Sequence, residues 1–360
     1  MGKKIWIKAN GNGIIATGHI RRCMTIAKEL QDLGCDVEFV LSDEMSANLL
    51  KTLSKEEDCS YDARILHTVF SEPMEDIPIL EVLLPEERPD FFLMDSYFLT
   101  EEYFAAVNGI IEKNKLSMKT GYMDDLYKFD YPVDLVVNYD IVVPEDFYSA
   151  PHKLLGADYA PLRKQFDNVC YDVIPYAKKA FLSAGGTDPY HVLGDILKEL
   201  YVNDSTCRKI PDFQEFTCEV IVGALFEEDY VRELKELAEK YPAIKLHESV
   251  PEMAELMKSC DFAVSAGGTT LYELCAVGVP TVVFSMADNQ VEFVKAFDDF
   301  GAVKYAGDVR EENRIVHKIV AWGLAAVSDR DFRARMSETA RNLVDGDGAN
   351  KIAHAIIEII

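Results

Sequence analysis

Two series of short apolar segments, each followed by a loop and an amphipathic stretch, constrain the fold of this chain more than any other feature. In the first series, apolar residues alternate along Lys4–Ala9 with the period of a strand, and a glycine-rich loop over residues 10–18 follows. From His19 the apolar residues recur at helical spacing as far as Gly34, and Val37–Leu41 is predicted to form the next strand. A strand, a helix and a second strand in this order predict a right-handed parallel β-α-β unit.

Later segments extend this series and define a second one. Phe91–Met94 and Asp134–Val137 are apolar runs that end in polar residues, as later parallel strands would. The second series begins at Lys179, and its predicted elements are the strands Phe181–Ser183, Glu219–Val222, Asp261–Ser265 and Pro280–Phe284 and the helices His191–Leu200, Tyr230–Lys240 and Thr270–Ala276. Two such series predict an α/β protein with two doubly wound, Rossmann-like domains, over residues 1–165 and 176–345, that face an interdomain cleft. Residues 346–360 are predicted to form a helix that packs back on the domains.

Composition excludes several classes of protein. The 360 residues correspond to a little over two domains of about 150 residues, which can bury two cores without a metal or disulfide staple. Lys and Arg number 37 against 62 Asp and Glu, so the net charge is 37 − 62 = −25. A nucleic-acid or anionic-membrane partner requires a basic face and is therefore not expected. No apolar run reaches the roughly 18 residues of a membrane span, and residues 5–7 are too few for a signal-peptide core.

The eight cysteines are scattered along the chain without a C-x-x-C pair. This pattern favours core thiols in a reducing cytoplasm over a zinc or redox site. Together these features predict a cytoplasmic protein, a monomer or a weak homodimer, that acts on a small molecule without inserting into a membrane.

The first glycine-rich loop allows two interpretations. Gly11-x-Gly13-x-x-Ala16 matches the short fingerprint of dinucleotide-binding proteins. That fingerprint needs the helix to begin by its third small residue, which would put Gly18 in the first turn as a helix breaker. The loop is therefore predicted to extend to Gly18 and to place His19 at the helix N-terminus.

The position of His19 suggests a chemical role. Free N–H groups and the positive end of the helix dipole disfavour a charged imidazole, so the ring is expected to be neutral and able to take a proton from water or a hydroxyl. The structural alternative is a polar side chain that only satisfies backbone groups at the helix end.

The segment Ser265–Thr270 has the features of an anion-binding loop. Gly267 and Gly268 let the backbone approach a phosphate, and the helix that begins near Thr270 points its N–H groups toward it. Glu273, one turn further, is placed to accept hydrogen bonds from ribose hydroxyls. A tight strand-to-helix turn without a ligand would show the same pattern.

Three other polar groups accompany these loops. Asp288-Asn289-Gln290 follows the next strand and adds polar side chains at the same sheet edge. Asp124-Asp125 could bind a divalent metal, although an acidic pair on a loop more commonly forms a turn or a helix cap. Arg163-Lys164 is a basic pair near the domain junction, where it could contact a pyrophosphate or simply be solvated.

These loops together resemble the nucleotide-sugar hydrolases of pseudaminic acid biosynthesis, relatives of the MurG-type glycosyltransferases with the GT-B fold. The similarity extends over nearly the whole chain. The segments that carry it are Thr17-Gly18-His19-Ile20-Arg21-Arg22, Asp95-Ser96-Tyr97, Asp124-Asp125-Leu126, Gly156-x-x-Tyr159-x-x-Leu162-Arg163, Gly185-Gly186-Thr187-Asp188-Pro189, Ser265 to Glu273, Gly278-x-Pro280 and Ala287-Asp288-Asn289-Gln290.

The resemblance implies a GT-B fold and hydrolysis of a UDP-linked 2,4-diacetamido-2,4,6-trideoxyhexose to UDP and free sugar, with inversion at the anomeric carbon. It implies His19 as the base that activates water, Tyr97 as a catalytic residue beside the sugar, and no metal or cofactor. The substrate-binding residues that it implies are Gly18, Arg21, Arg22, Asp95, Arg163, Gly186, Thr187, Val250, Gly267, Gly268, Thr269, Thr270, Glu273, Asn289 and Gln290.

Two other functions remain open at this point. An inverting UDP-sugar glycosyltransferase would use the same nucleotide-binding half and the same base, His19, to activate an acceptor hydroxyl. A non-catalytic nucleotide-sugar binding protein would need the C-terminal loops but not His19.

Overall fold

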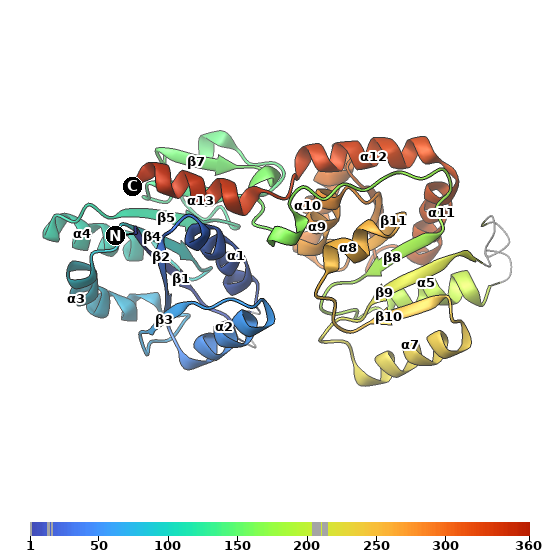
Figure 1. Cartoon of the computed structure of the whole chain (residues 1–360), viewed down its shortest axis with the longest axis horizontal. Coiled ribbons are helices and arrows are strands. Elements are labelled where there is room, and N and C mark those ends of the chain that lie inside the picture. Colours follow the sequence, from blue (N-terminus) through green and yellow to red (C-terminus); the bar gives the residue numbers. More distant parts are fainter. Residues whose placement is uncertain (1, 13–14, 16, 204–209, 211–214) are drawn as a thin grey trace. The chain divides into compact units, whose positions relative to one another are not determined.

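The computed structural model describes residues 2–12, 15, 17–203, 210 and 215–360, and the chain divides into two compact units (Figure 1). The N-terminal unit comprises Met1–Arg163 and Asp347–Ile360, and the C-terminal unit comprises Lys164–Gly346. In both sheets every pair of neighbouring strands is parallel. The prediction of two doubly wound parallel α/β domains is therefore confirmed.

The N-terminal unit contains a seven-stranded sheet with the strand order β3-β2-β1-β4-β5-β6-β7. Its elements are β1 (Lys4–Ala9), α1 (Gly18–Asp32), β2 (Asp36–Leu41), α2 (Glu44–Glu56), β3 (Asp62–Ile65), η1 (Pro73–Asp76), α3 (Ile77–Glu87), β4 (Phe91–Asp95), α4 (Glu101–Asn114), β5 (Lys119–Met123), β6 (Leu135–Asn138), η2 (Glu145–Phe147), β7 (His152–Leu155), η3 (Ala157–Tyr159) and, near the end of the chain, α13 (Gly348–Ile359). The predicted first strand, Lys4–Ala9, matches β1 residue for residue.

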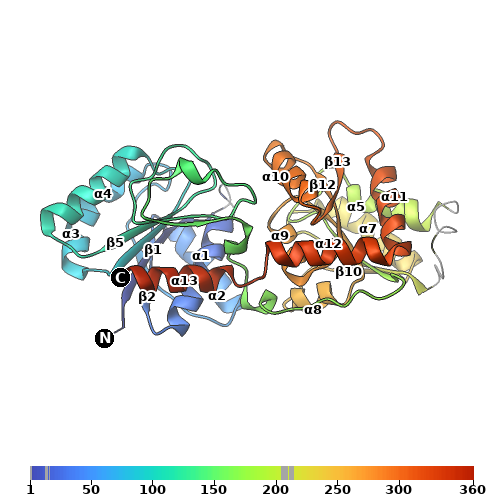
Figure 2. The ribbon, with the colours of Figure 1, turned by 90° about the horizontal axis from the view of Figure 1, so that it is seen from above.

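Successive side chains of β1 point to opposite faces of the sheet, and each face is covered by its own hydrophobic core. Ile5 and Ile7 pack in one core with apolar residues of α1, α2 and α13. Trp6 packs in the opposite core with residues of α3 and α4. The C-terminal helix α13 lies along α1 (Figure 2), so it completes the N-terminal core.

The C-terminal unit contains a six-stranded sheet with the order β10-β9-β8-β11-β12-β13. Its elements are η4 (Lys164–Phe166), β8 (Lys179–Ser183), α5 (Val192–Tyr201), β9 (Thr217–Ile221), α7 (Glu228–Lys240), β10 (Ile244–His247), α8 (Met253–Lys258), β11 (Phe262–Ala266), α9 (Thr269–Val277), β12 (Thr281–Ser285), α10 (Asp288–Asp299), β13 (Lys304–Asp308), α11 (Ile315–Ser328) and α12 (Arg330–Leu343). Ala180 and Leu182 of β8 pack with α5, α7 and α11 in one core. Phe181, between them on the other face, is also fully buried.

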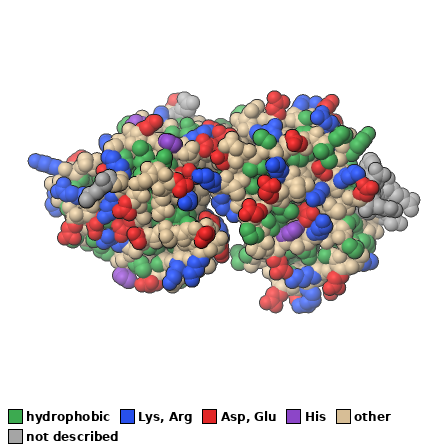
Figure 3. All heavy atoms as spheres, viewed as in Figure 1, with side chains coloured by type: hydrophobic (Ala, Val, Ile, Leu, Met, Phe, Trp, Pro, Cys, Tyr) green, Lys and Arg blue, Asp and Glu red, His purple; other side chains and the backbone are tan. Residues whose placement is uncertain are grey.

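Surface features of the described residues agree with the composition. On the face drawn in Figure 3, acidic and basic side chains are interspersed. Among the described residues, no helix combines the length and the apolar character needed to span a bilayer.

Of the cysteines that the structure describes, Cys23, Cys35, Cys218, Cys260 and Cys275 are buried. Burial raises the pKa of the Cys218 thiol to about 12, which leaves it unreactive at neutral pH.

Candidate active site

His19 is the second residue of α1, which begins at Gly18 directly after the first glycine-rich loop. The prediction that the loop extends to Gly18 and places His19 at the helix N-terminus is therefore confirmed. The alternative dinucleotide fingerprint involves Gly13 and Ala16, which lie outside the described residues. The acidic residue that this fingerprint requires after the second strand would be Asp43, which accepts a hydrogen bond from the Ser46 N–H as the N-cap of α2.

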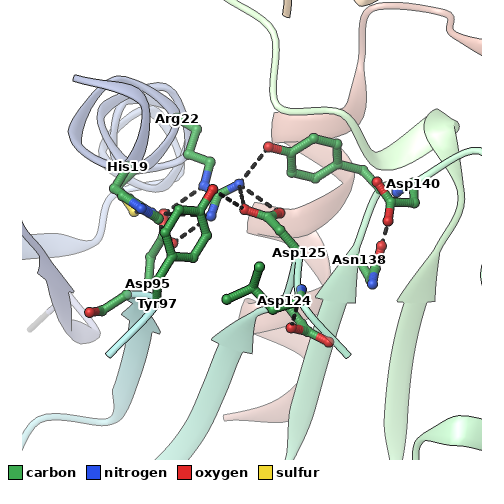
Figure 4. A network of polar contacts seen from close by, with 12 residues as sticks. His19, Arg22, Asp95, Tyr97, Asp124, Asp125, Asn138 and Asp140 are labelled. Carbon is green, nitrogen blue, oxygen red and sulfur yellow. Dashed lines mark hydrogen bonds and ion pairs between the residues drawn. The ribbon is translucent and has the colours of Figure 1, made fainter. Parts of the chain in front are cut away.

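The imidazole of His19 forms a short hydrogen bond with a buried carboxylate (Figure 4). Its Nδ1 lies 2.6 Å from Oδ1 of Asp95, the last residue of β4, and the Asp95 side chain is completely buried. Burial alone would raise the pKa of Asp95, but the charge of Arg22 and the hydrogen bonds from Arg22 and His19 outweigh burial and hold this pKa well below its usual range. Because an ionised carboxylate only accepts, Nδ1 carries the proton and Nε2 is the nitrogen that can act as a base.

Arg22, one turn after His19, connects the ends of three strands. Its Nε and Nη2 donate to the two oxygens of Asp95 at 2.6 and 2.5 Å. Its Nη1 donates to both oxygens of Asp125 at 2.9 and 2.8 Å and to the Tyr139 hydroxyl at 2.6 Å. Asp125 follows β5 and Tyr139 follows β6, so the guanidinium joins α1 to the carboxyl ends of β4, β5 and β6 (Figure 4).

Tyr97 lies beside His19 at the same edge of the sheet. The two ring centroids are 4.3 Å apart in an edge-to-face arrangement, and the Tyr97 hydroxyl donates to Asp125 at 3.1 Å. Burial and the Asp125 charge raise the pKa of Tyr97 above its usual value, so the phenol stays protonated at neutral pH. Tyr97 is 40% exposed, whereas the side chains of Arg22 and Asp125 are 10% and 22% exposed.

The adjacent carboxylates Asp124 and Asp125 point in different directions. Asp124 is buried and accepts hydrogen bonds from the Leu126 and Tyr127 N–H groups, as in an Asx turn, and from the hydroxyls of Tyr131 and Tyr148. Asp125 faces Arg22 instead. Among the described residues, no group of three or more His, Cys, Asp or Glu side chains is arranged to hold a metal ion. Asp124 therefore fixes the loop that presents Asp125.

In the C-terminal unit, β11 ends at Ala266 and α9 begins at Thr269, with Gly267 and Gly268 between them. A Cβ atom on Gly267 would lie 2.5 Å from Cγ2 of Val294, so this glycine allows α10 to pack closely against the loop. A Cβ atom on Gly268 would meet no atom within 4 Å. The N-cap of α9 is Gly268, which has no side chain to cap the helix, and both Gly268 and Thr269 are exposed.

The next helix, α10, begins beside this loop. Gln290 packs near Gly267, and its side-chain oxygen accepts a hydrogen bond from the Met286 N–H at 2.8 Å. Asn289, in the first turn, is exposed. The structure therefore brings the Gly267 loop and the first turn of α10 together, as expected for consecutive parallel β-α units.

A second glycine loop follows β8 at the same edge of the sheet. Gly185 has a positive φ of 79°, and Gly186 and Thr187 are exposed. Asp188 is buried, where it accepts hydrogen bonds from the N–H groups of Val192 and Leu193 at the start of α5. Asp188 therefore has a capping role, which leaves Gly186 and Thr187 as the accessible part of the loop.

The remaining candidate residues lie at the edges of these groups. Arg21 points to the end of α2, with Glu56 and Glu57 at 3.3 and 3.4 Å from its guanidinium nitrogens. Arg163 is the last residue of the first segment of the N-terminal unit. Val250 lies half-buried between β10 and α8, and Glu273 lies half-buried one turn into α9.

Two residues of the His19 network were not predicted in this role. For Asp125 the sequence suggests a metal ligand or, more commonly, a turn or cap residue, and Tyr139 belongs to none of the predicted site segments. Asp125 and Tyr139 each follow the carboxyl end of a parallel strand, β5 and β6, which end at Met123 and Asn138. Polar residues directly after such strands lie at the same sheet edge as His19, and this position is the sequence signal for both.

The fold is that of the GT-B glycosyltransferases, with two parallel-sheet α/β domains. The structure is similar to MurG of Acinetobacter baumannii, with a TM-score of 0.65 and 14% identity over 99% of each chain. Residues 212–353 match the C-terminal domain of glycosyltransferase family 28.

Three relatives found by sequence comparison are similar to a smaller part of this chain than the MurG structure is. The chain is 25% identical to the uncharacterized protein MJ1062 of Methanocaldococcus jannaschii, over 82% of this chain and 58% of that protein. It is 26% identical to the spore coat polysaccharide biosynthesis protein SpsG of Bacillus subtilis, over 55% and 56%. It is 33% identical to the Helicobacter pylori pseudaminic acid cytidylyltransferase and UDP-2,4-diacetamido-2,4,6-trideoxy-beta-L-altropyranose hydrolase, over 30% and 18%. The matched region spans little more than half of the first two relatives.

Proposed function

We propose that this protein hydrolyses a UDP-linked 2,4-diacetamido-2,4,6-trideoxyhexose to UDP and the free sugar, with inversion at the anomeric carbon. The observation that carries the proposal is the hydrogen bond of 2.6 Å between His19 Nδ1 and Asp95. It orients the imidazole, leaves Nε2 as a base, and provides a carboxylate that stabilises the imidazolium formed when His19 takes a proton from water.

The chemistry requires a base but no strong acid. An ordinary glycoside needs an acid because an alkoxide is a poor leaving group. A nucleoside diphosphate leaves as a stabilised anion, so preorganised N–H donors can replace that acid. The open N-terminus of α9 after Gly268 would bind the diphosphate with such donors. Water would then attack from the face opposite UDP, where His19 would remove its proton.

Two similarities support the choice of substrate. One is the set of sequence segments shared with the pseudaminic acid hydrolases, and the other is the partial match to the Helicobacter protein whose name includes this hydrolase activity. The similarity to the glycosyltransferase family 28 C-terminal domain and to MurG favours a second candidate, an inverting UDP-sugar glycosyltransferase. That enzyme would use the same base on an acceptor hydroxyl.

Incubation with a panel of UDP-sugars, without any acceptor, tests the proposal. Release of UDP and of free sugar with inverted anomeric configuration, followed by NMR, is the expected result. Turnover only after addition of a sugar or lipid acceptor would establish the transferase instead. Binding of UDP-sugars without turnover under either condition would establish a non-catalytic binding protein.

The Gly268→Ala variant tests the nucleotide site separately. The added methyl group meets no protein atom within 4 Å, and the φ of Gly268 is 176°, an extended value open to any residue, so the fold is expected to be unchanged. If the diphosphate contacts the backbone here, the methyl group should weaken UDP binding by about 10-fold or more, since that loss corresponds to only about 1.4 kcal/mol. Isothermal titration calorimetry with UDP measures this loss.

Gly267→Ala provides the contrast for this measurement. Its Cβ atom would overlap with Val294, and overpacking of this kind costs about 1–3 kcal/mol of stability. A Gly268→Ala variant that binds UDP as tightly as the wild type would place the diphosphate elsewhere.

A further inference from the structure

Resting on the proposed function, we infer that Arg22 is a positioning residue for the base: it holds Asp95 in line with Nδ1 of His19, and its positive charge opposes the addition of a proton to the imidazole. This differs from the direct contact with substrate that the sequence suggested for Arg22.

The hydrogen bonds of Arg22 leave little capacity for substrate. Its Nε and Nη2 donate to Asp95, and its Nη1 donates to Asp125 and Tyr139. The side chain is only 10% exposed. A phosphate oxygen would have to displace one of these acceptors, so the guanidinium acts within the protein.

The paired contact with Asp95 fixes the carboxylate in space. Two parallel N–H···O bonds from one planar group define both the distance and the orientation of a carboxylate. Oδ1 of Asp95 accepts from Arg22 and from His19 at the same time, at 2.5 and 2.6 Å. The direction of the Asp95–His19 hydrogen bond therefore depends on Arg22.

The charge of Arg22 matters as much as its geometry. Asp140, the residue after Tyr139, also interacts with the Arg22 charge. The charged groups in direct contact with the imidazole or with Arg22 are the carboxylates of Asp95 and Asp125 and the guanidinium itself, and the neighbouring side chains of Tyr97, Tyr139 and Cys23 are neutral. Their sum is one negative charge with Arg22 present and two without it. Two uncompensated carboxylates would favour the protonated imidazole, which cannot accept a proton from water. The guanidinium, whose Nη2 lies 3.3 Å from Nδ1, opposes that protonation.

The test compares Arg22→Gln with the wild type by two independent measurements. In ¹H–¹³C spectra of the histidine Cε1 positions, with the His19 signal assigned by its loss in His19→Asn, the titration midpoint of His19 is expected to rise by about one to three pH units in Arg22→Gln. In kinetics, the acid limb of the pH–kcat profile is expected to shift in the same direction. At neutral pH kcat is expected to fall about 100-fold, with KM within about threefold of the wild type.

Two further variants separate charge from geometry. Arg22→Lys keeps the charge but cannot form the paired contact, so its midpoint is expected to stay near the wild-type value while kcat falls. Arg22→Gln combined with Asp125→Asn restores the sum of one negative charge, so its midpoint is expected to return toward the wild-type value even though Arg22 is absent. Near-UV circular dichroism and thermal unfolding of each variant monitor the fold.

Arg64→Gln is the matched control. Arg64 lies on β3 of the same sheet and also pairs with two carboxylates, Glu38 and Glu87, at 2.9 and 3.0 Å, but none of these residues contacts His19. Its kcat and its His19 midpoint are expected to equal those of the wild type.

An unchanged His19 midpoint in Arg22→Gln would overturn the inference, as would a large rise in KM with unchanged kcat. Because the NMR titration does not depend on turnover, absence of UDP release in the wild type would contradict the proposed hydrolase while the midpoint still decides the role of Arg22.

Discussion

His19→Asn is expected to lower kcat for UDP release by about 10²–10⁴-fold, the usual contribution of a general base. The amide can still form a hydrogen bond with Asp95, but it has no basic nitrogen to accept a proton from water. The Kd for UDP is expected to stay unchanged, because the nucleotide would bind to the C-terminal unit. Single-turnover release of UDP measures the rate, and calorimetry with UDP measures the binding.

His152→Asn is the control for this experiment. His152 is an exposed residue at the start of the edge strand β7 and belongs to the same unit. Its replacement is expected to leave kcat unchanged. Full activity in His19→Asn would remove His19 as the base, whereas a parallel loss of UDP affinity would indicate that the substitution disturbs more than the chemical step.

Lys8→Met is expected to produce the largest loss of stability, about 3–5 kcal/mol, since it removes one partner of a buried ion pair. Lys8 lies on β1 and pairs with Asp76 at the end of η1, and both side chains are almost completely buried. Without the ammonium group, the Asp76 carboxylate would retain the Thr68 hydroxyl at 2.6 Å but no counter-charge. Urea denaturation followed by far-UV circular dichroism measures the loss in free energy of unfolding.

Two comparisons distinguish burial from charge. Lys4 also lies on β1, and it forms an ion pair with Glu87 of α3 at 2.5 Å, but both side chains are partly exposed. Lys4→Met is therefore expected to lower the free energy of unfolding by only about 0–1 kcal/mol. Lys8→Met combined with Asp76→Leu removes both buried charges and is expected to be considerably more stable than Lys8→Met alone. If Lys8→Met were as stable as Lys4→Met, the buried pair would contribute nothing to folding.

The order of elements and the position of His19 could be predicted because their signals are local. Apolar periodicity predicts the exact bounds of β1, and Gly18 marks the start of α1. The edge strands β3 and β7 were not predicted, because their side chains are exposed or half-buried and leave no apolar run. The sequence resemblance found Asp95, but not its hydrogen bond to His19.

The role of Arg22 could not be predicted for a different reason. Its partners Asp125 and Tyr139 are 103 and 117 residues away in the sequence, and only the parallel pairing of β4, β5 and β6 brings them to one edge. A basic residue next to a proposed active site suggests an anionic substrate unless its internal acceptors are known. The chain has a net charge of −25, and the Arg22 guanidinium is paired with two of its own carboxylates, Asp95 and Asp125.

The packing of α13 on α1 has a consequence for the order in which the protein can fold during synthesis. The C-terminal unit is continuous over Lys164–Gly346, so all of its residues are available once the ribosome has passed that segment. The helix that carries His19 is made first, yet Ile352 and Ile356 of α13 are fully buried in the same core as Ile20 of α1. The N-terminal core therefore stays incomplete until α13 emerges, and the half of the molecule synthesised first is the last to reach its final packing.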